Sequence, residues 1–281
     1  MDSQLKAIAY GMTGSWADAE EIVQEAHARV LSHPKKVESE SAYLYRVVCN
    51  LAHDHLRKEK VRRREYFGPW LPEPVTDERL DVVELHQELS LGFLLLMEHL
   101  TPGERIVFVL REVFDFSHAE LASMLELSVS AIRQRYSRAK TRLRKAGRVR
   151  TAPTAEIQAL LEQMMQHVLA SDVDGLISLM SRDVVAITDG GGVVSAAIQP
   201  VYEPNRIATV IMHLVQKNLQ LEDVQISFES LNESVSLLIL QRGEFHSITT
   251  LSVADGKISA IYVLRNPEKT AGFSDKLPQT S

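Results

Sequence analysis

Side chains suited to reading DNA bases lie together just beyond residue 130. The stretch from Arg133 to Arg150 is rich in cations and contains no acid. Arginine and glutamine can each make two hydrogen bonds to a base edge in the major groove, and serine and arginine also bond phosphates. A helix beginning at Val129 would bury an apolar stripe of Ile132, Tyr136, Ala139 and Leu143. Its outward face would then hold Ser130, Arg133, Gln134, Ser137 and Arg138.

A second set of residues suits single-stranded DNA. The apolar repeat from Ser41 to Glu59 predicts a helix, and one side of that helix carries an aromatic, an amide and several cations. These residues are Tyr43, Arg46, Asn50, His53, Arg57 and Lys58, and the basic run continues to Arg64. Bases can stack on such side chains while the cations follow phosphates. Many surface helices have this composition, so the pattern alone is weak.

A third set of residues is acidic. Residues Trp16–Val30 show a helical apolar repeat, with Ser15 as the expected N-cap. A different face of this helix carries Asp18, Glu21, Gln24 and Glu25. That face is either a solvated surface, which is the commoner case, or a docking surface for another protein.

The element that would position the first set is a helix-turn-helix. Residues Ser117–Leu125 form a short helix, Glu126–Ser128 a tight turn, and the basic helix follows and enters the major groove. Two more helices are predicted before it, at Val82–Leu100 and from Thr101-Pro102 to about Val113. The alternative is an all-α bundle with a basic surface helix.

The stretch Tyr66–Pro74, which reads YFGPWLPEP, separates the two helical groups. Three prolines and a glycine predict a stiff, extended backbone, yet Trp70 and Leu71 lie in its middle. A solvated linker would be poor in such residues. The stretch is therefore either a ribbon held by another part of the chain or a loop whose tryptophan enters the nearest core.

The pattern changes after a second linker at Arg148–Pro153. Helical segments are predicted at Ala155–Leu169, Asp174–Met180 and Asn205–Gln216, with a glycine turn at Asp189–Gly192. Strands are predicted at Val224–Phe228, Val235–Leu240, His246–Val253 and Lys257–Leu264, with Asp255-Gly256 as a hairpin turn. Helices followed by a curved antiparallel sheet predict an α+β cone with a central cavity.

Composition limits the classes of protein that fit. A chain of 281 residues is long enough for two domains or three small ones. The net charge of −6 comes from the C-terminal part, because residues 1–150 hold 23 basic and 22 acidic side chains. A single cysteine, Cys49, excludes an internal disulfide and fits a reducing cytosol. We see no signal peptide and no apolar run of membrane-spanning length, so we expect a cytoplasmic protein that does not bind membranes.

Together these motifs resemble a bacterial extracytoplasmic-function sigma factor of the sigma-70 family, in the branch with a fused SnoaL-like C-terminal domain. The residues AYGMTGSWADAEEIVQEA from Ala9 and SAYLYRVVCNLAHDHLR from Ser41 are similar to region 2. The stretch LTPGERIVFVLREVF and the helix-turn-helix after it are similar to region 4. WLPEP from Trp70 matches the linker signature of the branch, DGGG from Asp189 matches another signature, and NPEKT from Asn266 approximates a third.

The resemblance implies roles for the three sets of residues. Asp18, Glu21, Gln24 and Glu25 would bind core RNA polymerase. Asn50, His53, Arg57 and Lys58 would contact the −10 element as promoter DNA opens, and Ser130, Arg133, Gln134 and Arg138 would read the −35 element. We expect an interdomain regulatory contact between the linker and the C-terminal domain, made by Trp70, Leu71, Pro72, Asp189, Gly190, Gly191, Asn266 and Pro267.

The resemblance also implies a division of the chain. The fold class expected is two all-α sigma domains followed by an α+β SnoaL-like cone. The expected segments are region 2 at 1–65, the linker at 66–81, region 4 at 82–147, a second linker at 148–153, the SnoaL-like regulatory domain at 154–265 and a tail at 266–281. No catalytic residue, cofactor or metal is expected, and the cavity of the cone could accept an unknown small ligand.

Two other functions fit parts of the sequence. SnoaL-like cones also occur in isomerases and hydrolases, and Asp189, His213 and His246 are the candidate acid/base residues here. Asp189 lies in a glycine turn, however, and the histidines have no evident carboxylate partner. A helix-turn-helix repressor with a sensor domain is the other alternative, and it leaves the region 2 pattern and WLPEP unexplained.

Overall fold

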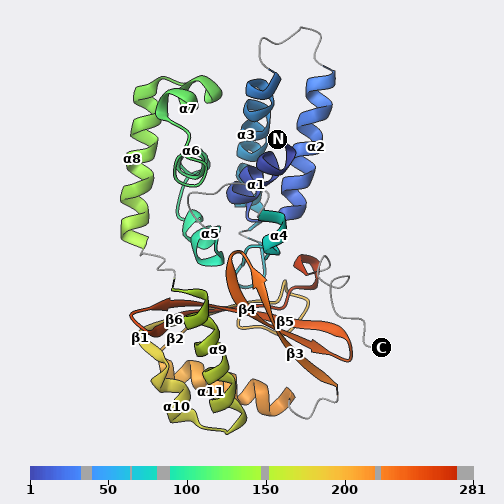
Figure 1. Ribbon diagram of the computed structural model, residues 1–281, viewed down its shortest axis with the longest axis vertical. Helices are drawn as coiled ribbons and strands as arrows, with labels where there is room; N and C mark the ends of the chain where they lie inside the picture. The colour runs from blue at the N-terminus through green and yellow to red at the C-terminus, as the bar shows by residue number, and fades with distance from the viewer. Residues whose placement is uncertain (33–39, 64, 81–88, 147–151, 219–222, 271–281) are drawn as a thin grey trace. The chain divides into compact units, whose positions relative to one another are not determined.

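The chain forms two compact units. The computed structural model describes residues 1–32, 40–63, 65–80, 89–146, 152–218 and 223–270. The first unit comprises Met1–Glu65 and Val75–Arg148, and the second comprises Tyr66–Pro74 and Val149–Ser281 (Figure 1). The proline-rich stretch thus belongs to the C-terminal unit, although the chain on both sides of it belongs to the first.

The first unit is all helical in its described part. Its helices are α1 (Asp2–Thr13), α2 (Trp16–Leu31), α3 (Glu40–Arg62), α4 (Asp77–Leu80), α5 (Leu91–Met97), α6 (Pro102–Glu112), α7 (His118–Leu125) and α8 (Val129–Ala146). The predicted helices at Trp16, Ser41, Thr101, Ser117 and Val129 are confirmed to within a few residues. The last residues of the predicted basic stretch, 147–150, lie outside the described residues.

Local capping sets the helix-turn-helix. Thr101 and Glu104 form a capping box at the start of α6, and Ser117 and Glu120 form another at the start of α7. Helix α7 ends at Leu125, and its C-cap residue Glu126, with a φ of 53°, turns the chain toward α8. The buried stripe of α8 packs against α6 and α7 through Ile132 and Ala139, both without exposed surface.

The helix predicted at Val82–Leu100 is wrong in its extent. Residues 81–88 lie outside the described residues, and α5 covers only Leu91–Met97. Ser90 has an extended backbone and its hydroxyl accepts the Phe93 N–H at 3.3 Å, so it caps a new helix. The apolar repeat continues across Ser90, so the repeat alone does not reveal that α5 begins there.

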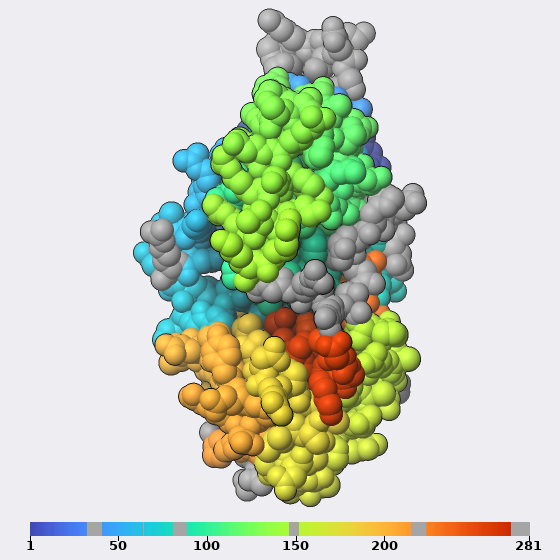
Figure 2. Space-filling view, turned by 90° about the vertical axis from the view of Figure 1, so that its left-hand side faces the viewer, coloured from blue at the N-terminus to red at the C-terminus, as the bar shows by residue number. Residues whose placement is uncertain are grey.

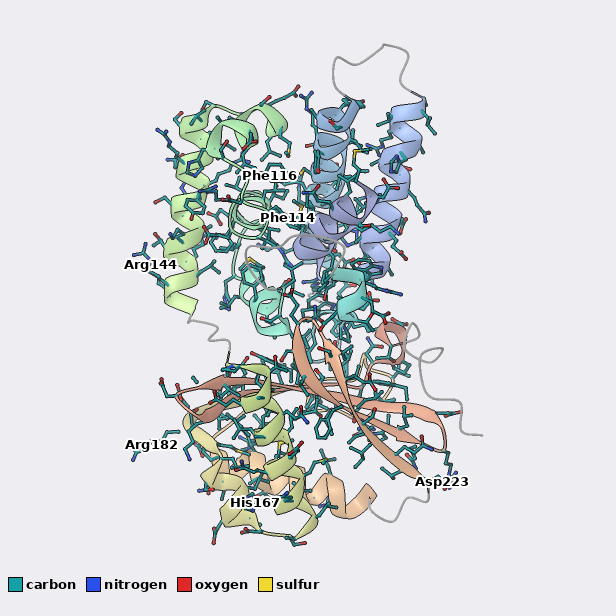
Figure 3. The ribbon with its side chains drawn as sticks, in the orientation of Figure 1. Phe114, Phe116, Arg144, His167, Arg182 and Asp223 are labelled. Carbon is teal, nitrogen blue, oxygen red and sulfur yellow. The ribbon has the colours of Figure 1, made fainter. Side chains whose placement is uncertain are left out.

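One core joins the two helical groups of the first unit. Residues of α1, α2 and α3 share a continuous buried cluster with those of α6, α7 and α8. Tyr45 on α3 meets Phe116 edge to face at 5.7 Å, and Phe116 lies inside this unit in Figure 3. Arg46 on α3 forms an ion pair with Glu126 at 2.6 Å. The helix-turn-helix is therefore packed directly on the N-terminal helices.

The second unit is a six-stranded sheet with helices on one face (Figure 1). The strands are β1 (Met180–Asp189), β2 (Val201–Tyr202), β3 (Val224–Leu231), β4 (Ser234–Gln241), β5 (Glu244–Ala254) and β6 (Lys257–Leu264), in the order β2-β1-β6-β5-β4-β3. The helices are α9 (Thr154–Leu169), α10 (Val173–Ser178), α11 (Pro204–Asn218) and the 3-10 turn η1 (Pro267–Lys269). The four predicted strands and the Asp255-Gly256 turn are confirmed.

The expectation of a purely antiparallel sheet was wrong. Strand β1 was not predicted, and it pairs in parallel with β6 and antiparallel with β2. The helix expected at Asp174–Met180 ends at Ser178, and Met180 already belongs to the strand. A bulge between Met180 and Val185 interrupts the alternation of β1, so its short apolar run lacks a clear strand period.

Candidate nucleic-acid interface and linker clasp

The outward face of α8 is as the sequence predicts. Ser130, Arg133, Gln134 and Arg138 are exposed, while Tyr136 is half-buried and stacks on Phe108 at 6.1 Å. Figure 2 shows α8 on the surface of the first unit. The Ser130 hydroxyl lies 2.9 Å from that of Ser128, at the start of the helix. Four polar side chains along one exposed helix face have the geometry of a groove-reading surface.

The predicted face of α3 also lies at the surface. Asn50, Arg57 and Lys58 are exposed, and His53 is half-buried with its Nδ1 3.7 Å from a carboxylate oxygen of Asp54. Because these residues recur on one side of a single helix, their side chains form a continuous polar stripe. The stripe combines cations with a base-bonding amide.

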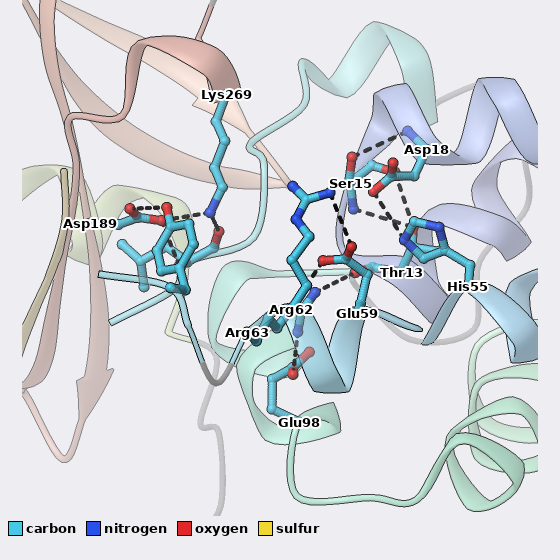
Figure 4. Close-up of polar contacts among 12 residues, drawn as sticks. Thr13, Ser15, Asp18, His55, Glu59, Arg62, Arg63, Glu98, Asp189 and Lys269 are labelled. Carbon is cyan, nitrogen blue, oxygen red and sulfur yellow. Dashed lines mark hydrogen bonds and ion pairs between the residues drawn. The ribbon is translucent and has the colours of Figure 1, made fainter. Parts of the chain in front are cut away.

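The four residues predicted on α2 divide into two groups. Glu21, Gln24 and Glu25 are exposed, with Glu25 bound to Arg29 at 2.7 Å. The Asp18 carboxylate instead lies 3.3 Å from the His55 Nε2 of α3 (Figure 4). Burial raises the pKa of Asp18, but His55 and Ser15 outweigh burial and hold it below its usual value. Asp18 thus ties α2 to α3.

A polar cluster in the second unit holds the proline-rich stretch, and we call it the linker clasp: Tyr66, Leu71, Asp189, Asn266 and Lys269. The fully buried Asp189 carboxylate accepts the Leu71 N–H at 2.9 Å and the Tyr66 hydroxyl at 2.6 Å. The Asn266 amide donates to the Tyr66 oxygen at 2.9 Å. The segment is therefore fixed through its backbone as well as its side chains.

Lys269 closes the clasp (Figure 4). Its Nζ donates to the Leu71 carbonyl at 2.5 Å and lies 2.6 Å from the Asp189 carboxylate. The same ammonium lies 5.2 Å from the ring centre of Tyr66 and 4.3 Å from that of Trp70. A buried carboxylate is stable only with such pairing, so Asp189 depends on Lys269 for its counter-charge.

The glycine turn shapes the clasp. Gly191 has a φ of +64° and donates its N–H to Asp189 at 3.0 Å. A Cβ at Gly191 would lie 2.5 Å from the Asn266 side chain, and one at Gly190 would lie 2.3 Å from the Val194 carbonyl oxygen. Asn266 itself caps η1 by accepting the Glu268 N–H at 3.0 Å. Only residues without a side chain fit both glycine positions.

The other residues predicted for the interdomain contact have mixed surroundings. Leu71 and Pro72 are buried and Trp70 is half-buried, whereas Pro267 is exposed as the first residue of η1. Burial and the Asp189 carboxylate raise the pKa of the Tyr66 phenol, so it acts as a neutral hydrogen-bond donor. Of the predicted set, Trp70, Leu71, Asp189, Gly191 and Asn266 thus lie at the clasp.

Sequence reasoning missed Tyr66 and Lys269 as members of this site. Tyr66 lies in the stretch YFGPWLPEP and Lys269 in NPEKT, so the sequence marked both segments but not these two residues. Neither residue type marks a contact by itself, because exposed lysines and half-buried tyrosines are common. Only the tertiary pairing with Asp189 distinguishes them.

The three candidate acid/base residues have separate surroundings. The described contacts of the Asp189 carboxylate are those of the clasp, and His213 is exposed on α11. His246 lies 3.2 Å from a guanidinium nitrogen of Arg265 and 3.2 Å from the Ser247 hydroxyl. In the described part of the chain, then, no hydrogen bond or ion pair joins a carboxylate to His213 or His246.

Comparison with protein families defines the class of the first unit. The sigma-70 region 2 model matches residues 2–62 and the sigma-70 region 4 model matches residues 90–143. The region 2 match thus covers α1–α3, and the region 4 match covers α5–α8 with the helix-turn-helix.

Relatives over the whole length define the group more closely. The chain is 32% identical over 285 residues to the ECF RNA polymerase sigma factor SigJ of Mycobacterium tuberculosis, covering 95% of this chain and 90% of SigJ. The crystal structure of that SigJ matches with a TM-score of 0.76 at 29% identity, covering 96% and 95% of the two chains. The probable ECF sigma factor SigI of that species is 26% identical, covering 92% and 89%.

The chain belongs to the ECF RNA polymerase sigma factors. It directs promoter-specific transcription initiation, and its partners are core RNA polymerase and promoter DNA. The predicted fold class is confirmed in its main features: helical sigma modules are followed by an α+β unit. Among the described residues, the helices are all too short or too polar to cross a membrane.

Proposed function

We propose that the C-terminal unit is a built-in regulator that acts by holding the segment Tyr66–Pro74. This segment connects region 2 to region 4 along the chain, so its conformation limits how far apart the two modules can lie. The observation that carries the proposal is the linker clasp, in which Asp189 and Lys269 bind the N–H and the carbonyl of Leu71. A clasped segment and a released one define two states with different spacing of the DNA-reading modules.

The surfaces of the first unit have separate roles in this proposal. Glu21, Gln24 and Glu25 face core polymerase, and Asn50, His53, Arg57 and Lys58 face the −10 element. Ser130, Arg133, Gln134 and Arg138 face the −35 element. The working segments remain 1–65, 66–81, 82–147, 148–153, 154–265 and 266–281. This role places the protein in the cytoplasm with the polymerase.

A catalytic role for the C-terminal unit has less support. Asp189, the candidate carboxylate, is fully buried and is engaged by Tyr66, Leu71 and Lys269. A general base needs a proton of the substrate within hydrogen-bond reach, which those partners prevent. We therefore assign the unit a regulatory function and no reaction.

Lys269→Met tests the regulatory role, with Lys257→Met as the matched control. Both lysines donate to a backbone carbonyl within the second unit, but Lys257 binds Ser178 and lies outside the clasp. Lys269→Met should speed hydrogen exchange of the Leu71 amide and change run-off transcription by the reconstituted holoenzyme. An increase means that the clasp inhibits, and a decrease means that it holds a productive spacing.

Two results would count against the proposal. Transcription equal to that of the parent, with the Leu71 amide shown to be released, would make the segment a plain linker. An equal change with Lys257→Met would assign the effect to a general loss of charge. Deletion of the whole unit is a less informative test, because it removes the partner of a buried leucine as well.

A further inference from the structure

A cavity of about 230 Å³ lies inside the second unit, between the helices α9 and α11 and the strands β3–β6. Its wall is mainly apolar and includes Met164, Met165, Ile211, Leu237, Ile239 and Ile261. A dry apolar cavity of roughly 150 Å³ can take up benzene. This cavity is larger, so it has room for a small organic molecule.

The polar residues that line the cavity are Arg265, His246, Gln241, Ser247 and Thr249. Arg265 donates from Nη1 to the Ser195 carbonyl at 2.6 Å, and its Nη2 lies 3.2 Å from the His246 Nε2. The Nε of Arg265 is buried and has no hydrogen-bond partner among the described residues. One donor of a guanidinium is thus left without an acceptor.

Among the described residues, the charge of Arg265 also has no counter-ion. The described residues that line the cavity include no aspartate or glutamate. Desolvation lowers the pKa of Arg265, and burial together with Arg265 lowers that of His246, so the histidine is neutral and adds no charge. The Arg265 side chain is half-buried, so its charge is only partly solvated, and the unmade hydrogen bond of its buried Nε is costly. One bound anion would both pair the charge of Arg265 and accept a hydrogen bond from its Nε.

We propose that this cavity binds a small molecule with an apolar body and a single carboxylate, whose carboxylate bonds to Arg265. Guanidinium binds carboxylate through two parallel hydrogen bonds, and an Arg265 freed from Ser195 would offer such a pair. The apolar wall would hold the hydrocarbon part. Medium-chain fatty acids and small aromatic acids have this chemistry.

The position of Arg265 connects the cavity to the clasp, and this step rests on the proposed regulatory function. The Arg265 backbone N–H donates to the Asp189 carbonyl at 2.8 Å, and the next residue is the clasp residue Asn266. The Arg265 guanidinium also holds Ser195, three residues after Gly192. A ligand that draws the guanidinium away from Ser195 therefore acts on the loop that shapes the clasp.

Binding is tested on the full chain with decanoate, with decan-1-ol as the neutral ligand of equal length. Displacement of the dye 1-anilinonaphthalene-8-sulfonate at pH 7.5 reports occupancy. We expect decanoate to bind at least ten times more tightly than decan-1-ol, because only the acid pairs with Arg265. Equal affinity of the acid and the alcohol, or no displacement by either, would overturn the proposal.

Arg265→Met and Arg182→Met form the variant pair. Arg182 is an exposed arginine on β1 that points away from the unit (Figure 3), so its loss should leave both affinities unchanged. Arg265→Met should keep decan-1-ol binding, which shows that the cavity is intact, and lose the preference for decanoate. A preference retained in Arg265→Met would also refute the assignment.

Coupling to the clasp is a separate measurement. Saturating decanoate should change hydrogen exchange of the Leu71 amide in the parent but not in Arg265→Met. Tight, Arg265-dependent binding without that change would leave the ligand site standing and refute the link to the clasp. Failure of the Lys269→Met test would instead refute the regulatory function, whatever binds in the cavity.

Discussion

Acidic residues three positions apart on α2 have different surroundings. Asp18 pairs with His55 of α3, whereas Glu21 is exposed. The helical repeat places both on one face, but it carries no information about the partner on another helix. The Glu21 carboxylate can therefore bind an external partner, whereas the Asp18 carboxylate binds His55 within the unit.

Reversal of charge at Glu21 tests the polymerase surface. Glu21→Lys should weaken binding to core RNA polymerase about tenfold or more while shifting the stability of the chain by about 0.5 kcal/mol or less, since the site is exposed. Asp18→Lys should lower stability as well, because it removes the carboxylate that contacts His55. Affinity for purified core enzyme and urea unfolding measure the two effects. Glu244→Lys, at an exposed site in the second unit, is the control. Unchanged affinity of Glu21→Lys would remove this residue from the interface.

Base reading is tested at Arg133 and Gln134. Replacement of either by alanine should cost about 1–3 kcal/mol at the cognate −35 sequence if the side chain bonds a base edge. Binding of promoter fragments by holoenzyme, compared with fragments whose −35 element is scrambled, measures the loss. Arg144→Ala, at an exposed site near the end of α8, should weaken both fragments alike. Equal losses on both DNAs would reduce Arg133 and Gln134 to phosphate contacts.

At the scale of elements, the sequence predicts those helices and turns that depend on residues close together along the chain. The helix-turn-helix follows from two capping boxes and an apolar repeat that can be read along the chain. Strand β1 does not follow, because its partner β6 is remote in sequence and a bulge hides its period. The clasp lies between these cases: the stretches that form it stood out by composition, but the pairing of Tyr66 and Lys269 with Asp189 required the tertiary fold.

The glycine turn provides a matched pair of variants. Gly191 and Gly243 both have positive φ, so alanine costs similar backbone strain at either site. A Cβ at Gly191 would overlap Asn266, whereas a Cβ at Gly243 meets no atom within 4 Å. Gly191→Ala should therefore speed hydrogen exchange of the Leu71 amide, and Gly243→Ala should leave it as in the parent. Equal exchange in the two variants would show that Asn266 does not support the clasp.

At the scale of the first unit, an ionic cluster helps hold region 2 on region 4. Arg63, the residue after α3, and Arg105 of α6 both bind Glu98, and Arg105 is only 3% exposed. Burial raises the pKa of Glu98, but the two arginines outweigh burial and keep it below its usual value. The carboxylate thus stabilises the packed unit above pH 4.5, and this stabilisation is lost as the pH falls below that value.

Glu98→Gln tests this cluster. The variant should lose about 1–3 kcal/mol of stability at pH 7, because Arg105 remains buried without a counter-charge. The difference from the parent should shrink as the pH falls below 4.5, where Glu98 of the parent also becomes neutral. Urea unfolding over a pH series measures both. A difference that does not depend on pH would assign the loss to packing and not to charge.

The packed first unit is too small to read both promoter elements. A compact unit of about 140 residues has a radius of gyration of about 14 Å, so it extends roughly 40 Å. The −35 and −10 elements are about 25 base pairs apart, or about 85 Å at 3.4 Å per pair. We therefore expect region 2 and region 4 to separate when the protein acts on a promoter.

Spin labels on introduced cysteines at Gln24 and Arg144 can follow this separation, since both sites are exposed. The native Cys49 should not react, because it is buried and burial raises the pKa of its thiol to about 12. We expect a short distance in the free protein and a much longer one in the complex with core polymerase and promoter DNA. An unchanged distance would mean that the packed unit is itself the active form.

The order of synthesis gives the clasp a consequence in time. Leu71 leaves the ribosome 118 residues ahead of Asp189 and 198 residues ahead of Lys269. At about 5–20 residues per second, roughly 10–40 s pass between the appearance of Leu71 and that of Lys269. Every newly made molecule therefore completes both DNA-reading modules while its linker is still unclasped. A chain cut short before Lys269, by a premature stop or a protease, would lack the residue that closes the clasp. Its linker would therefore stay unclasped permanently.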